Sequence, residues 1–66
     1  MQIKVNDKTR ETENGISLLS FLENAKITAS KTVVTLNGAT LDLDQFETTV
    51  LKENDKLELF SFVGGG

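Results

Sequence analysis

Residues 31–41 read KTVVTLNGATL, and this stretch decides the fold because it encodes a β-hairpin. The run before the turn contains the β-branched residues Val33 and Val34, which favour extended backbone. Asn37 and Gly38 follow, a pair that readily adopts the positive φ angles of a type I′ turn. The stretch therefore predicts two antiparallel strands joined by a two-residue turn.

Two further strands are expected near the two ends of the chain. Residues 1–7 (MQIKVND) place Ile3 and Val5 on one face and polar residues on the other, which is typical of a half-buried strand. Residues 56–63 (KLELFSFV) predict a strand with the same apolar alternation. Because both alternate strongly, we expect them side by side in the centre of one sheet.

A charged segment, residues 8–12 (KTRET), lies between the first strand and the middle of the chain. Asn6 and Asp7, which precede this segment, are residue types that favour turns, so the segment is expected to form the second arm of a hairpin. A segment that is polar on both faces fits a sheet edge, where charge discourages aggregation.

One short helix is predicted after Asn14 and Gly15. Ser17 is the expected N-cap, because its hydroxyl can accept a hydrogen bond from an amide of the first turn. Ile16 and Phe21 have the spacing of a hydrophobic staple. The apolar residues with helical spacing are Leu18, Leu19, Phe21, Leu22 and Ala25. Further along, Asp42 or Asp44 is expected to cap a single helical turn that carries Phe46, and residues 53–55 to form a turn.

The predicted order is strand, strand, helix, strand, strand, helical turn, strand. One helix can cover one face of a mixed sheet of four or five strands, with right-handed connections between parallel strands. We therefore expect an α+β protein with the β-grasp, ubiquitin-like arrangement. Residues 1–63 are predicted to form this domain, and Gly64, Gly65 and Gly66 a flexible C-terminal tail.

Composition argues against catalysis by the chain itself. The 66 residues include no Cys and no His, so a thiolate nucleophile, a cysteine metal site and the usual near-neutral general base are all missing. A domain of this size also has too little chain to enclose a small-molecule pocket. We expect a protein that is not an enzyme and binds no metal or cofactor.

Charge and hydropathy exclude further classes of partner. Ten acidic and seven basic residues give a net charge of −3, which argues against nucleic acid. No apolar run is long enough for a transmembrane helix, and no signal-peptide pattern follows Met1. The sequence predicts a cytoplasmic protein that contacts neither nucleic acid nor membrane.

The start MQIKVND, the LNG hairpin and the ending NDKLELFSFVGGG together resemble the ThiS/MoaD family of sulfur carriers. The resemblance spans the whole chain and is greatest to the ThiS branch, which serves thiamine biosynthesis. Its most specific part is the glycine ending, where Gly65 and Gly66 match the family's terminal pair and Gly64 is an additional spacer.

The resemblance implies that the protein works as a substrate. In such carriers a ubiquitin-activating-like adenylyltransferase uses ATP to adenylate the C-terminal carboxylate, here that of Gly66. A sulfur donor such as a cysteine desulfurase then provides the sulfur of a thiocarboxylate. Thiazole synthase is the partner that receives this sulfur.

The chemistry of the tail agrees with this implication. A terminal carboxyl group has a reference pKa of about 3.3–3.7 and is ionised near neutral pH. Three extended glycines span about 10 Å. Without Cβ atoms they can enter a narrow channel and adopt φ angles closed to other residues. The alternative is a frayed chain end without function.

Two surface features are candidate contacts for partners. Phe60 and Phe62 should emerge on the face of the last strand opposite to Leu57, Leu59 and Val63, and an aromatic pair beside the tail is a natural docking patch. The alternative is that the sheet curls and covers Phe60. The acidic second half could complement a basic enzyme surface, although such charges more often form a solvated face. Its members are Asp42, Asp44, Glu47, Glu53, Asp55 and Glu58.

Proteins with other functions can end in the same kind of glycine tail. Sulfur carriers for molybdopterin, cysteine or homocysteine synthesis or for tRNA thiolation use equivalent chemistry. A ubiquitin-like modifier would instead join its terminal carboxylate to lysines. A pure interaction module would have an inert tail. The fate of the terminal acyl group separates these classes.

Overall fold

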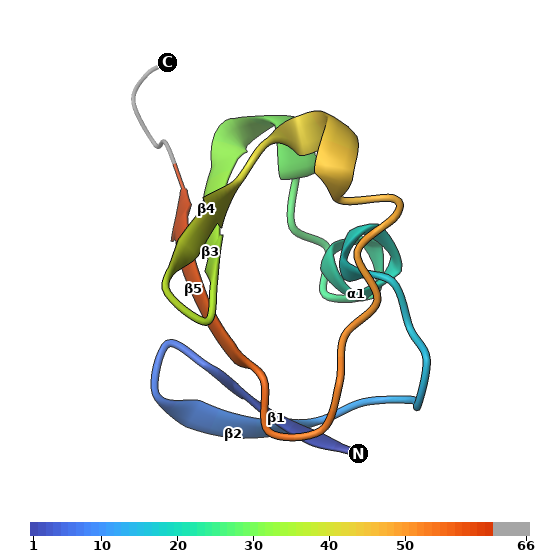
Figure 1. Cartoon of the computed structure of the whole chain (residues 1–66). Coiled ribbons are helices and arrows are strands. Elements are labelled where there is room, and N and C mark those ends of the chain that lie inside the picture. The colour runs from blue at the N-terminus through green and yellow to red at the C-terminus, as the bar shows by residue number, and fades with distance from the viewer. Residues whose placement is uncertain (62–66) are drawn as a thin grey trace.

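The computed structural model describes residues 1–61. Five strands form one sheet, and one α-helix packs against it (Figure 1). The elements, in chain order, are β1 (Gln2–Val5), β2 (Lys8–Glu11), α1 (Leu18–Asn24), the 3₁₀ turn η1 (Ala29–Lys31), β3 (Thr32–Leu36), β4 (Ala39–Leu41), the 3₁₀ turn η2 (Leu43–Gln45) and β5 (Lys56–Ser61).

The strand order is β2-β1-β5-β3-β4. β1 and β5 are parallel neighbours at the centre, with Val5 opposite Leu57, and the other neighbouring pairs are antiparallel. This confirms the predicted central position of the first and last strands and the edge position of β2. The sheet curls around α1, which lies on its concave side (Figure 1). The fold is therefore the β-grasp fold.

Both hairpins close with two-residue turns. Asn37 (φ 50°) and Gly38 (φ 90°) join β3 to β4, as the sequence predicts. Asn6 (φ 51°) and Asp7 (φ 70°) join β1 to β2 with the same pair of positive φ angles. A two-residue turn of this kind fixes the strand register, so it determines which side chains face α1.

The helix begins where its cap predicts. The Ser17 Oγ accepts from the Ser20 backbone N–H at 3.1 Å, and Ile16 and Phe21 are both buried, as a hydrophobic staple requires. At η2 the cap is Asp42, whose backbone N–H donates to the Gln45 Oε1 at 2.7 Å in a capping box. The sequence predicts either Asp42 or Asp44 as the cap, and the structure has Asp42.

The core lies between the sheet and α1, with Phe46 closing one side. Its buried apolar members are Ile3, Val5, Ile16, Leu18, Phe21, Leu22, Val34, Phe46, Leu51 and Leu57. A short helix of seven residues depends on this burial, because isolated helices of that length are not stable in water.

The turn η1 is not predicted by the sequence. The Lys31 backbone N–H donates to the Thr28 carbonyl oxygen at 3.1 Å, and the Thr32 hydroxyl donates to the same oxygen at 2.8 Å. These bonds bring the chain from the end of α1 into β3. Residues 29–31 (ASK) carry neither an apolar period nor a turn pair, so no local signal marks the turn.

Candidate functional site

Both hairpin turns hold β5 in place by asparagine side chains. At its start, the Lys56 backbone N–H donates to the Asn37 Oδ1 at 2.9 Å, and the Asn37 backbone N–H donates to the Lys56 carbonyl oxygen at 2.8 Å. The Asn37 Nδ2 also donates to the Asp55 Oδ1 at 3.0 Å. The beginning of β5 is therefore fixed to the turn between β3 and β4.

Asn6 does the same further along β5. Its Oδ1 accepts from the Leu59 backbone N–H at 2.8 Å, its Nδ2 donates to the Leu59 carbonyl oxygen at 3.3 Å, and its own backbone N–H donates to the Leu57 carbonyl oxygen at 2.9 Å. Because β1 ends at Val5, the Asn6 side chain takes the place of the next strand residue. β5 is thus held on one side as far as Leu59 and on the other, by β3, as far as Ser61.

The strand presents different residues to its two sides. Leu57 is fully buried against α1, whereas Phe60, three residues further on, is 59% exposed. Val33 lies opposite Phe60 in the register and shares its face, where it is half-buried. The predicted exposure of Phe60 is confirmed. Its role in binding a partner stays a prediction.

The remaining predicted site residues lie outside the described residues. These are Phe62 of the aromatic pair and Gly64, Gly65 and Gly66 of the tail, together with Val63 and the boundary between domain and tail. Their roles stay predictions. The described part of the chain ends at Ser61, so what the structure adds is the strand that leads to them.

Several acidic residues of the second half make local hydrogen bonds. The Asp55 Oδ2 accepts from the Lys52 backbone N–H at 2.7 Å, and the Glu53 Oε1 accepts from the Gln2 backbone N–H at 3.1 Å. Asp42 belongs to the capping box of η2. These carboxylates therefore have structural roles in turns, which favours the interpretation of the acidic half as a solvated face.

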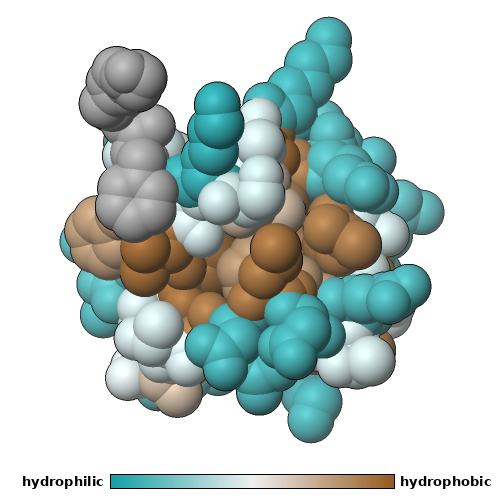
Figure 2. All heavy atoms as spheres, turned by 90° about the horizontal axis from the view of Figure 1, so that it is seen from above, coloured by the Kyte–Doolittle hydropathy of each residue, from teal (hydrophilic) through white to brown (hydrophobic). Residues whose placement is uncertain are grey.

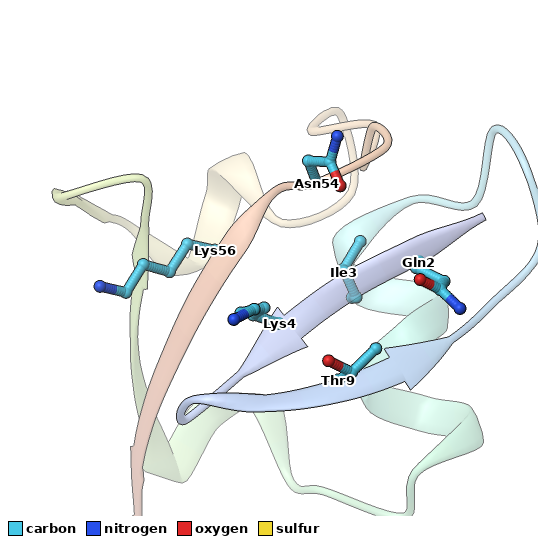
Figure 3. A pocket seen from close by; sticks show the side chains of 6 residues that line it. All are labelled: Gln2, Ile3, Lys4, Thr9, Asn54 and Lys56. Atoms are coloured by element: carbon cyan, nitrogen blue, oxygen red, sulfur yellow. The ribbon is translucent and has the colours of Figure 1, made fainter.

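A hollow of about 220 Å³ lies at the other end of the sheet from Ser61. Figure 3 shows the Lys4 ammonium between β1 and β5, while the Lys56 side chain points away from Ile3. Lys56 begins β5 and Ser61 ends it, so about 17 Å of strand separates this hollow from the end of the described chain. The hollow therefore lies away from the end of the described chain.

The face that carries η1 and η2 has an apolar centre with a hydrophilic border (Figure 2). Leu43 of η2 is 53% exposed.

Within residues 1–61 there is no group of three or more His, Cys, Asp or Glu residues that could hold a metal ion. Over the same residues, no helix has the length and apolar character needed to cross a membrane.

The geometry defines a small β-grasp protein whose last strand is anchored by two asparagines and carries an exposed phenylalanine. The family model named ThiS family matches residues 3–66 of the chain. Because this match covers nearly the whole sequence, the chain belongs to the ThiS family.

Two solved structures agree with this assignment. The crystal structure of the thiamine biosynthesis protein ThiS from Geobacter metallireducens superposes with a TM-score of 0.86 at 30% sequence identity, and the match covers 100% of both chains. The NMR structure of a thiamine biosynthesis protein from the same organism gives a TM-score of 0.81 at 32% identity, covering 100% of this chain and 88% of the other. No curated protein matches the chain.

Proposed function

We propose that this protein is a sulfur carrier for thiamine biosynthesis, and that the carboxylate of Gly66 is the group that carries the sulfur. The observation that supports this most is the ThiS family match, which extends over residues 3–66 and so includes the glycine ending. The similarity to the Geobacter metallireducens ThiS over its full length gives the same indication.

The proposed chemistry takes place at the last carbonyl carbon. A carboxylate oxygen of Gly66 attacks the α-phosphorus of ATP and pyrophosphate leaves, which forms an acyl adenylate. The terminal sulfur of a persulfide on a donor such as a cysteine desulfurase then displaces AMP at the same carbon, and a thiol reductant cleaves the S–S bond of the acyl disulfide that forms. The resulting thiocarboxylate delivers sulfur to thiazole synthase. In this scheme the activating enzyme uses ATP, and the carrier provides no acid, base or metal.

Two features of the folded part of the chain support the proposal: the fixed position of β5 and the exposure of Phe60. β5 is held by Asn37 at its start and by Asn6 at Leu59, so the residues that follow leave from a fixed position. Phe60 is exposed beside that position and provides apolar area for docking. A rigid body with a reactive chain end suits a protein that must enter two active sites in turn.

Intact-mass analysis of the protein isolated from cells tests the proposal. We expect a fraction of the molecules to be heavier by the difference between one sulfur and one oxygen atom. The shift should map to the C-terminal peptide and be absent from a variant that lacks Gly66. A terminal carboxylate that never gains sulfur, in cells with an active thiamine pathway, would contradict the proposal.

The same analysis distinguishes the other classes. Adducts joined to lysines of other proteins through Gly66 would indicate a ubiquitin-like modifier. A thiocarboxylate that thiazole synthase does not consume, but that another sulfur-requiring pathway does, would place the carrier in that other pathway.

A further inference from the structure

Lys26 occupies a position at which helices normally place glycine. After α1, the Ile27 backbone N–H donates to the Leu22 carbonyl oxygen at 2.9 Å and the Lys26 backbone N–H donates to the Glu23 carbonyl oxygen at 3.0 Å. This pair of bonds is the Schellman motif, and its left-handed residue is Lys26, with a φ of 61°. Glycine adopts this φ without steric cost, whereas a lysine does not.

Lys26 borders a hollow next to the end of β5. The hollow has a volume of about 250 Å³ and is lined by Lys26, Ile27, Thr28, Lys31, Thr32 and Ser61. The Thr32 hydroxyl is already used, because it donates to the Thr28 carbonyl oxygen. Ile27 contributes half-buried apolar surface. The charged residues of the lining are Lys26 and Lys31.

The charge of this hollow is opposite to that of the chain. The protein has a net charge of −3, yet two of its seven cations line one hollow whose lining contains no acidic residue. Ser61 lies at the same place and leads directly into residues 62–66. The hollow therefore adjoins the last described residue of β5.

We propose that this hollow, which we call the lysine hollow, is a docking site for a carboxylate-rich segment of the ATP-dependent enzyme that activates Gly66. This inference rests on the proposed function for the identity of the partner. Aspartate and glutamate side chains complement the two ammonium groups, and the apolar part of the segment covers Ile27. Such complementary charge accelerates encounter and fixes orientation. The lysine at the left-handed position is then retained for binding, at a cost in stability.

The test uses Lys26→Gly, because this substitution separates stability from binding. Glycine relieves the left-handed backbone, so the urea midpoint should rise. The Kd for the activating enzyme should nevertheless increase about threefold to tenfold at low salt, since one ammonium is lost. In Lys26→Gly/Lys31→Ala the Kd should increase further and depend less on salt. Saturating carrier should restore the rate of adenylation, so KM changes and kcat does not.

Two control variants separate local from general effects. Lys8→Ala removes one positive charge from β2 at the far edge of the sheet. Asn54→Gly replaces another left-handed residue, with a φ of 69°, without changing the charge. Both should leave the Kd within about twofold of the wild type. Binding of inorganic pyrophosphate to the carrier alone, measured by NMR shifts at Lys26 and Lys31, probes a small anion as the alternative ligand.

The outcomes are distinct. If the double variant binds the enzyme as tightly as the wild type or the Lys8→Ala control, the proposal is wrong. Pyrophosphate binding that Lys26→Gly/Lys31→Ala abolishes would also overturn it, in favour of a small-anion site. If the wild type binds the enzyme through the lysines but no pyrophosphate is released from ATP, the proposed function fails while the docking site stands.

Discussion

The two faces of the sheet differ in the solvent exposure of their side chains. The covered face, represented by Ile3, Val34 and Leu57, is buried against α1 and makes the core. The open face, represented by Lys4 and Phe60, lies in solvent. β5 contributes to both, because successive side chains of a strand point to opposite sides. One strand thereby contributes side chains both to the core and to the exposed face, and substitutions on its two sides should have separable effects.

The covered face should show the largest effect on stability. Leu57 is fully buried, so Leu57→Ala should reduce the free energy of unfolding by about 2–5 kcal/mol through lost burial and the cavity left behind. Urea unfolding followed by circular dichroism measures the change. Leu43→Ala is the matched control, because Leu43 is 53% exposed and the same substitution there should cost about 0.5 kcal/mol or less. Equal losses at the two sites would contradict the assignment of Leu57 to the core.

The bond between Asn6 and β5 should give the next largest effect. Asn6→Gly keeps the positive φ but removes two hydrogen bonds to Leu59, which should cost about 1–2 kcal/mol. The Leu59 amide should also exchange its hydrogen faster. Asp7→Gly, in the same turn with a φ of 70°, is the control and should not accelerate that exchange. Unchanged exchange at Leu59 in Asn6→Gly would show that the side chain does not hold the strand.

The N-cap of α1 should come third. Ser17→Ala removes the acceptor for the Ser20 amide and should reduce the free energy of unfolding by about 1 kcal/mol. Ser17→Asp restores an acceptor and should recover most of the loss. Thermal unfolding of the wild type, Ser17→Ala and Ser17→Asp measures these changes in stability. A variant with aspartate that is as unstable as the alanine variant would indicate that the loss comes from packing and not from the cap.

The open face should show the smallest effect on stability and a large one on binding. Phe60 is 59% exposed, so Phe60→Ala should cost about 0.5 kcal/mol or less in stability. If Phe60 anchors the activating enzyme, the Kd should rise by about 30-fold, as for an interface hot spot. Phe62→Ala is expected to weaken binding in the same way.

Val50→Ala is the control for Phe60, because Val50 is 49% exposed and lies outside the sheet. Its Kd for the activating enzyme should match that of the wild type. Isothermal titration calorimetry on folded protein gives both affinities. If Phe60→Ala and Val50→Ala bind alike, the open face does not provide the docking patch.

Much of the fold was predictable because its signals are local. The pair Asn37 and Gly38 specifies its turn through backbone sterics alone. The alternation of Ile3 and Val5 gives the phase of β1, and the phase of β5 correctly predicts that Phe60 faces away from Leu57. Each of these depends on residues that are close together in the sequence.

Other features gave no local signal. Asn6 is recognisable as a turn residue, but its hydrogen bonds to Leu59 join residues 53 positions apart. Lys26 lies at a left-handed position where glycine is the usual residue, so the end of α1 was not marked. The choice between Asp42 and Asp44 depended on the geometry of Gln45.

By itself, the sequence determined the turns, the strand phases, the helix cap and the glycine ending that the ThiS family shares, because these follow from backbone preferences and short-range patterns. Only the tertiary structure decided that Asn6 and Asn37 hold β5 and that Lys26, Lys31 and Ser61 border one hollow. The physical reason is that hydrogen bonds and charges between distant segments exist only after hydrophobic burial has brought the strands and the helix together.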